Sequence, residues 1–342
     1  MSLATVPTLE QRPTHKFAPL LRSEVSRLTH RRLFRVLVVV LFGAILVIST
    51  IVFFAHHDEP AASTGAIPRS IERAEAEWQD CVKLLPRDQS VQRHCGPEPI
   101  NQSFNAYDYG PDPRYKAYEV LPVVLIGTAI AAAGVAFLMG ASSGGAEWSS
   151  RSMTLQLLFE PRRLRLLCVK WLALVILTAA LAAAAMALSL GLGALTASAR
   201  GTWDDQYALV PELKDHLLNS MLTMGGRGLI LVVVAATLGY ALAMLVRNTG
   251  ASLGVAFIYF VILENGVRYA LMRYGAEPFM LSTNAVASVI SGGLEVPGAA
   301  RGPGGQLSSV HLSNLRATAT MLTYCAIISI PAAWSFMRRD VS

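Results

Sequence analysis

The feature that most constrains this sequence is a set of six apolar blocks that can cross a bilayer as helices. A transmembrane helix needs about 20 predominantly apolar residues. Hydrophobic residues make up 53% of the 342 residues, and charged residues only 15%. We therefore predict an all-α polytopic membrane protein with six transmembrane helices. The predicted spans cover about residues 36–55, 120–141, 171–197, 229–246, 250–268 and 318–337.

Basic residues predict the orientation of the spans, because cytoplasmic loops are enriched in lysine and arginine. We place both termini, the segment between spans 2 and 3, and the turn at Arg247 inside. The inside then holds 15 of the 29 basic residues but only 5 of the 23 acidic residues, and the opposite orientation would reverse this bias. We expect a multi-pass protein of the cytoplasmic membrane whose N-terminus and C-terminus are cytoplasmic.

Residues 1–35 form a basic N-terminal region ahead of a six-span domain over residues 36–342. Part of this region has an apolar and a polar face at helical spacing, which predicts an interfacial amphipathic helix in the headgroup layer of the membrane. A disordered basic tail is the alternative. The apolar face carries Phe17, Leu20, Leu21, Val25 and Leu28, and the polar face carries Arg22, Ser23, Ser26, Arg27 and His30.

The polar segment 56–118 is predicted to be an extracellular loop. It contains a helical stretch from Ile67 to Leu85 and the only two cysteines in polar sequence, Cys81 and Cys95. Disulfides form in oxidising compartments, so we predict that Cys81 and Cys95 are linked. Two free cysteines are the alternative.

The fifth span carries charge at its outer end. Its uncharged part, from Gly250 to Leu263, is only about 21 Å long as a helix, which is shorter than the hydrocarbon core. Either the helix continues through Glu264 and Arg268, or a short helix is followed by a re-entrant piece. Glu264 and Arg268 are one helical turn apart, so we predict an ion pair between them. The alternative is that both side chains lie unpaired in the headgroup zone.

The region after span 5, residues 269–317, is predicted to lie outside. It contains a weakly apolar helix from Asn284 to Ile290 and a Gly/Pro-rich stretch from Pro297 to Gly305. In span 2, Gly127 and Gly134 predict points of close helix approach.

Residues 140–144 match the G-x-S-x-G string of hydrolases. However, they lie at a helix end, and the hydrolase motif needs a strand–turn–helix elbow. We interpret them as small residues at the end of the span.

The segment between spans 2 and 3 is predicted to be cytoplasmic and to contain a short helix. Residues 147–159 lack Gly and Pro, and Pro161 can end the helix. Met153, Leu157 and Leu158 recur at helical spacing and form an apolar ridge, while Glu147 and Arg151 are spaced i, i+4. Such a helix suits docking to a soluble partner. The alternative is that the ridge packs on the protein's own span ends.

This segment resembles the ABC-2 family of ABC transporter permeases. In that family a Glu after the second span precedes a (Gly/Ser)-x-Thr-Leu-x-x-Leu-Leu run, a Pro-x-x-Arg sequence and a Lys that opens the third span. One departure is Ser152-Met153-Thr154, where Gly-Thr is common. The matching residues are Glu147, Ser152, Thr154, Leu155, Leu157, Leu158, Pro161, Arg162, Arg163 and Lys170.

The resemblance implies that residues 147–159 are a coupling helix that fits a groove on a separate ABC ATPase subunit. It also implies short re-entrant helices between spans 5 and 6, assembly with a second copy or a paralogue, and ATP-driven export. ATP and Mg would be bound by the partner subunit, and no cofactor is expected in this chain. The expected ATPase-coupling residues are Glu147, Trp148, Arg151, Met153, Thr154, Leu157 and Leu158.

Other function classes find less support in the sequence. No glycine precedes any of the five lysines, so the chain has no Walker A sequence and is not expected to hydrolyse ATP alone. Basic-aromatic grooves and zinc-finger spacings are absent, so no nucleic acid is expected as a partner; the basic balance instead indicates contact with anionic membrane lipid. The alternatives are an intramembrane enzyme, such as a protease or lipid-group transferase, and a non-transporting sensor with a permease-like fold.

Overall fold

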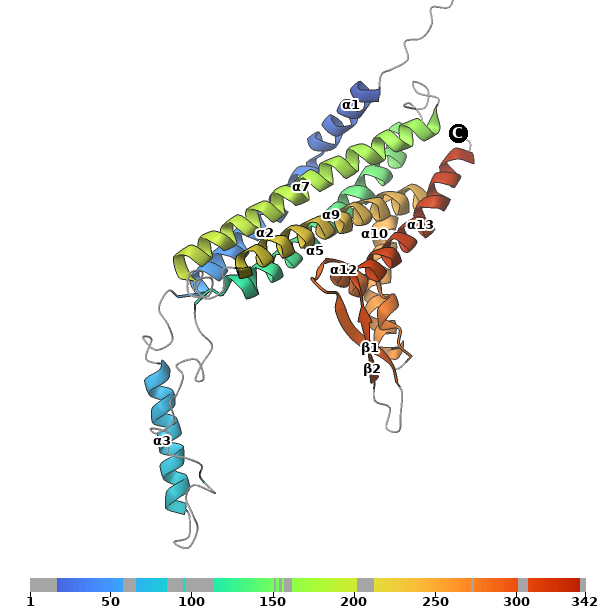
Figure 1. Cartoon of the computed structure of the whole chain (residues 1–342). Coiled ribbons are helices and arrows are strands. Elements are labelled where there is room, and N and C mark those ends of the chain that lie inside the picture. Colours follow the sequence, from blue (N-terminus) through green and yellow to red (C-terminus); the bar gives the residue numbers. More distant parts are fainter. Residues whose placement is uncertain are drawn as a thin grey trace, which may run out of the picture. The chain divides into compact units, whose positions relative to one another are not determined.

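The described part of the chain, in a computed structural model, contains six helices long and apolar enough to cross a membrane (Figure 1). The described residues therefore contain as many long apolar helices as the predicted spans, which is consistent with a multi-pass membrane protein. The described residues are 17–57, 66–84, 95, 114–150, 152–153, 156, 162–201, 212–271, 274–300 and 307–338.

All six helices are longer than the apolar blocks that predicted them, because a helix can continue into polar sequence once it leaves the hydrocarbon. The six are α2 (Arg32–Ala55), α5 (Ala117–Ser149), α7 (Arg163–Arg200), α9 (Glu212–Val246), the composite helix Thr249–Leu271, and α13 (Asn314–Arg338).

The end of α5 differs from the prediction. Glu147 and Trp148 belong to the last turns of this membrane helix, which ends at Ser149, and do not open a separate helix. Close packing against α9 explains why α5 continues through its glycines. A Cβ at Gly144 would lie only 3.0 Å from the backbone oxygen of Tyr240 in α9, so a larger residue would push the two backbones apart by a few tenths of an ångström.

A second close contact between α5 and α9 is reciprocal. A Cβ at Gly140 would collide with the backbone oxygen of Ala236, and a Cβ at Gly239 with that of Phe137. In contrast, no atom of the described residues lies within 4 Å of a Cβ placed at Gly127 or Gly134. Within the described part of the chain, those two glycines therefore do not make the predicted close approach, and the small residues at the helix end make it instead.

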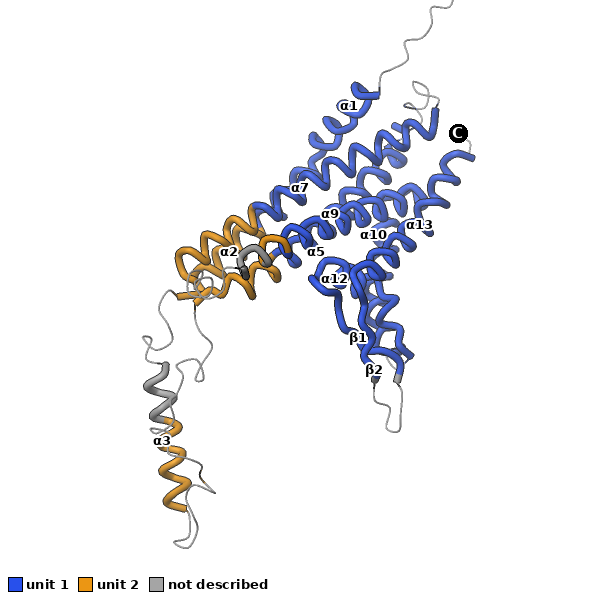
Figure 2. The backbone as a smooth tube through the Cα atoms, in the orientation of Figure 1, with its two compact units in different colours: residues 1–43, 125–187, 220–342 blue, residues 44–124, 188–219 orange. Residues whose placement is uncertain are grey.

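The chain divides into two compact units, which Figure 2 shows in different colours. Unit 1 contains residues 1–43, 125–187 and 220–342, and unit 2 contains residues 44–124 and 188–219. Both candidate sites described below lie within unit 1.

In unit 2, the predicted helix of the long polar segment is present as α3 (Ala66–Leu84). The predicted disulfide is also confirmed, because Cys81 and Cys95 are bonded. Tyr115, just ahead of α5, is fully buried, and its backbone N–H donates to the carbonyl of Arg200 at 2.8 Å. Burial raises the pKa of Tyr115 to about 12.

The predicted N-terminal amphipathic helix is α1 (Phe17–His30). Leu28 on its apolar face is buried, whereas Arg22 and Arg27 on its polar face are exposed. Arg31 separates α1 from α2 and is not helical. The chain therefore bends at Arg31 as it passes from the amphipathic helix into the first span.

The fifth span continues through Glu264 and Arg268, which selects the first of the two predicted alternatives. It begins after a tight turn in which Arg247 has a left-handed backbone, with φ 61°. Asn248 then caps the helix, since its side-chain oxygen accepts from the N–H of Ala251 at 3.0 Å. Its three parts are α10 (Thr249–Ile258), the π-helical η2 (Tyr259–Val267) and α11 (Arg268–Leu271).

A short region follows the fifth helix, with η3 (Glu277–Phe279) and α12 (Leu281–Val289). The helix predicted at Asn284–Ile290 corresponds to α12, although it begins three residues earlier. The Gly/Pro-rich stretch is partly an antiparallel hairpin of β1 (Leu294–Ala300) and β2 (Leu307–Leu312), which the sequence analysis did not predict within the otherwise α-helical fold.

The hairpin has an alternating apolar pattern. Leu294 pairs with Leu312, and Val296 pairs with Val310. Leu312 is fully buried with Ala287 of α12 and Ala317 of α13, and Leu294 packs against them. The hairpin is thus held by a small apolar core between α12 and α13, which is a tertiary contact that local sequence does not reveal.

Candidate functional site

A buried group of charges, which we call the ion cluster, joins three elements that are distant in sequence. Lys170 of α7 contacts two carboxylates: its Nζ lies 3.1 Å from Glu24 Oε2 in α1 and 2.9 Å from Glu147 Oε2 near the end of α5. The side chains of Lys170, Glu24 and Glu147 are only 4%, 6% and 8% exposed. Charges this deeply buried are tolerated only when they are paired.

Arginines from the N-terminal region complete the ion cluster. Arg31 donates to Glu147 Oε1 at 3.1 Å and to the backbone oxygen of Ser142 at 3.3 Å. Arg27 lies at the rim, 3.3 Å from Glu24, with its side chain 55% exposed. Lys170 and Arg31 therefore balance the two buried carboxylates, and Arg27 adds a solvent-accessible charge.

Local sequence explains how each element presents its charge. The bend at Arg31 carries this side chain back toward α5. On α7, Leu166 and Val169 are buried beside Lys170, so packing of the apolar face brings the lysine inward. On α1, Glu24 lies three residues after Leu21 and four before Leu28, which places it on the apolar face rather than the polar one.

The sequence pattern pointed to Glu147 and Lys170 but not to Glu24 or to the role of Arg31. A signal for Glu24 was present, because it is an acidic residue within the apolar stripe of an amphipathic helix. Such a residue needs a cationic partner when the stripe is buried. No local pattern could have named Lys170 as that partner, since 146 residues separate the two.

The predicted ATPase-coupling residues are only partly described. Trp148 contacts the protein's own helices: its Nε1 lies 3.3 Å from Met244 Sδ, and the Arg247 guanidinium lies 4.4 Å from the centre of its ring. Met153 is fully buried. This burial is what we expect for this residue if the apolar ridge packs on the protein's own span ends, which was the alternative to docking. Arg151, Thr154, Leu157 and Leu158 lie outside the described residues, so their role in docking stays a prediction.

A third buried carboxylate, that of Glu264 in η2, is 2% exposed and lies in a second network. The predicted ion pair is present, with Arg268 3.4 Å from Glu264 Oε2. Tyr259 donates its hydroxyl to Glu264 Oε1 at 2.9 Å. The two side chains are spaced i, i+4 in the sequence, and they remain within contact distance in the π-helical geometry of this segment.

Glu264 also accepts hydrogen bonds from the N-terminus of α12. The backbone N–H of Leu281 donates to Oε1 at 2.6 Å, and that of Ser282 at 3.3 Å. A negative charge is favourable at a helix N-terminus, where backbone N–H groups lack helical partners. Arg268 meanwhile lies 3.4 Å from Glu277. The sequence predicted the pair but not this attachment of α12 to the fifth span.

Both clusters are internal networks in which buried carboxylates are paired with basic side chains. Among the described residues, no three His, Cys, Asp or Glu side chains gather closely enough to hold a metal ion. Comparison with protein-family models, curated proteins and solved structures finds no match to this chain.

Proposed function

We propose that this chain is the membrane permease subunit of an ABC-2-type transporter, driven by ATP hydrolysis in a separate subunit and acting in export. The observation that carries the proposal is the ion cluster. Its members Glu147 and Lys170 are the two charged residues that flank the proposed coupling segment in the resemblance. They are paired with each other and with Glu24.

The ion cluster supports a mechanical role for the segment between α5 and α7. A force applied to residues 150–162 reaches the end of α5 and the beginning of α7 directly through the backbone. The contacts of Lys170 with Glu24 and of Arg31 with Glu147 extend this connection to α1 and the start of α2. Because buried ion pairs resist separation, these helix ends move together when the segment moves.

In the proposed cycle, ATP closes two ATPase subunits, and each of them pushes on one coupling segment. Two six-span chains, identical or paralogous, form the membrane part. The basic segment and both termini face the cytoplasm, as the charge distribution predicts. Residues of this chain transmit motion, while ATP and Mg are held by the partner.

Purification of the full chain from its native membrane tests the proposal. We expect a separate ATPase with a Walker A sequence to co-purify, and the purified chain alone to show no vanadate-sensitive ATP turnover. Leu157→Asp should abolish co-purification of the ATPase while the chain still accumulates in the membrane.

A matched control is Leu84→Asp, because Leu84 is an 85% exposed leucine on α3, outside the proposed docking segment. This variant should retain the ATPase. ATP turnover by the chain alone, or equal ATPase recovery with Leu157→Asp and Leu84→Asp, would contradict the proposed function.

A further inference from the structure

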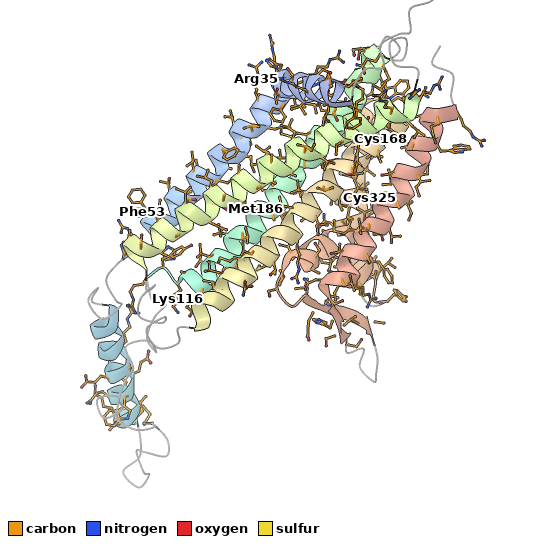
Figure 3. The ribbon with its side chains drawn as sticks, turned by 45° about the horizontal axis from the view of Figure 1, so that its top comes forward. Arg35, Phe53, Lys116, Cys168, Met186 and Cys325 are labelled. Atoms are coloured by element: carbon orange, nitrogen blue, oxygen red, sulfur yellow. A yellow bond between two sulfur atoms is a disulfide. The ribbon has the colours of Figure 1, made fainter. Side chains whose placement is uncertain are left out.

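An apolar groove of about 390 Å³ lies between α7, α9 and α13. Figure 3 labels a cysteine on each of two of these helices, Cys168 on α7 and Cys325 on α13. The volume is within the range of small-molecule and lipid sites, which are mainly apolar and often lie between the helices of a bundle. Its lining includes Leu167 on α7, Tyr240 and Met244 on α9, and Leu322, Ala326 and Ala333 on α13.

The groove is elongated along α13. Its lining runs from Leu322 to Ala333 on this helix, which corresponds to about 16 Å at 1.5 Å per residue. Since all three helices are candidate spans, the medium beside the groove is the hydrocarbon of the bilayer. A long apolar groove open to hydrocarbon suits an extended acyl chain.

One end of the groove is cationic. Arg163 lies one turn before Leu167 on α7, Arg247 lies three residues after Met244, and Arg338 lies five residues after Ala333 on α13. Arg163 donates to the carbonyl of Met337 at 3.3 Å, which joins the ends of α7 and α13. Neither Arg247 nor Arg338 makes an ion pair with a carboxylate that the structure describes.

Aromatic residues mark the same end as a membrane interface. The Arg338 guanidinium lies 4.6 Å from the centre of the Trp334 ring, and Trp334 is 53% exposed. Tryptophan is enriched at the headgroup level of membranes. Arg338, which lies beside this ring, is therefore at the depth where a lipid headgroup would lie, with the acyl chain extending along the groove.

We propose that this groove binds one acyl chain of an anionic lipid from the surrounding membrane, with the lipid headgroup held by Arg163, Arg247 and Arg338. Basic sites between transmembrane helices are suited to anionic headgroups. Tyr240 lines the groove, and its buried hydroxyl has no hydrogen-bond partner among the described residues.

The lipid site needs only that the three helices lie in a bilayer, so it does not depend on the proposed transport function. Its test uses the full chain without any ATPase. Native mass spectrometry should follow binding of phosphatidylglycerol and of phosphatidylcholine with the same acyl chains. We expect one phosphatidylglycerol per chain to be retained in preference to phosphatidylcholine, because only the former carries a net negative charge.

Two variants separate the headgroup from the acyl chain. Arg338→Gln should reduce the preference for phosphatidylglycerol by about fivefold, the effect of one arginine near a membrane surface. Arg316→Gln, at the other end of α13, is the matched control and should leave the preference unchanged. Ala326→Trp should fill the groove and reduce binding of both lipids, whereas Ala319→Trp on an exposed position outside the groove should not.

Three results would overturn the lipid site. The first is equal retention of the two lipids by the unaltered chain, which needs no variant to fold. The second is equal loss of lipid in Ala326→Trp and Ala319→Trp. The third is a lipid-free dimer that only Ala326→Trp dissociates, since a second copy of the chain would then occupy the groove.

Discussion

The two buried carboxylate networks of this protein are built at very different ranges along the chain. The ion cluster brings together residues 24, 31, 147 and 170, which come from three helices and a bend. The network around Glu264 draws on residues 259–283, within one composite helix and the short helix that follows it. The first network holds separate helices together, whereas the second binds the short helix α12 to the composite helix that precedes it.

The networks also differ in how many partners each charge has. In the ion cluster, Lys170 links α1 to α7, and each of its two carboxylate partners has one further basic partner, Arg27 for Glu24 and Arg31 for Glu147. Glu264 has several donors besides Arg268, including two backbone N–H groups. Removal of one charge should therefore lower the free energy of unfolding more in the ion cluster than around Glu264. Substitutions in the two networks can test this difference.

The largest expected effect is that of Lys170→Met. This variant leaves Glu24 and Glu147 buried with less positive charge nearby, and removal of one partner from a buried pair typically costs about 3–5 kcal/mol. Chemical unfolding of the purified chain in detergent measures the loss. Lys83→Met is the control, because Lys83 and its partner Asp80 are more than 70% exposed, and exposed pairs contribute little. Equal stabilities of the two variants would show that the ion cluster contributes no stability.

Removal of the disulfide should have a smaller effect that stays local to the polar segment. A bond between Cys81 and Cys95 closes a loop of 14 residues in sequence separation, for which chain entropy predicts about 3 kcal/mol of stabilisation. Cys81→Ser should increase proteolysis around α3 without changing the unfolding of the spans. Peptide mapping under non-reducing conditions should show the linked pair in the unaltered chain, and recovery of both thiols free would contradict the bond.

Around Glu264, we expect losses of about 1–3 kcal/mol for Glu264→Gln and for Arg268→Gln. The double variant should lose less than the sum, because the two side chains interact directly and each single change leaves a charge uncompensated. The same unfolding assay gives the double-mutant cycle. Additive losses would indicate that the 3.4 Å contact carries no interaction energy.

The smallest effect is expected for Tyr240, a buried residue whose hydroxyl takes no part in either network. The Tyr240 hydroxyl is buried without a partner among the described residues, so Tyr240→Phe should be neutral or slightly stabilising. Tyr259→Phe is the matched comparison, because its hydroxyl donates to the charged Glu264, and its loss should cost about 1.5–3 kcal/mol. A larger loss of stability in Tyr240→Phe than in Tyr259→Phe would contradict the expectation that the Tyr259 hydroxyl contributes more to stability.

Prediction from the sequence succeeded where the determining contacts are local. Hydrophobic block length predicted six spans, and the i, i+4 spacing of Glu264 and Arg268 predicted their contact. Prediction failed where partners come from distant segments. Lys170 was assigned to the start of a span, yet its partners lie on α1 and at the end of α5.

The glycines at the contact between α5 and α9 show the same limit of prediction from local sequence. Gly127 and Gly134 have the spacing expected of a helix contact, but the contact lies at Gly140, Gly144 and Gly239, because the neighbouring helix sets where two backbones meet. The hairpin was missed for a related reason: Pro297 and Gly298 are unfavourable in strands, and burial of Leu312 against Ala287 and Ala317 compensates for them.

Glu24→Gln is the most direct test of the idea that the ion cluster couples the segment between α5 and α7 to the rest of the helices. This change weakens the link to α1 but keeps the contact between Glu147 and Lys170. In the complex with the ATPase subunit, we expect ATPase binding to be unchanged and stimulated ATP turnover to fall about tenfold, equivalent to about 1.4 kcal/mol of coupling free energy. Arg22→Gln, on the exposed face of the same helix, should leave both unchanged. Normal turnover in Glu24→Gln with normal ATPase binding would contradict the coupling role of the ion cluster.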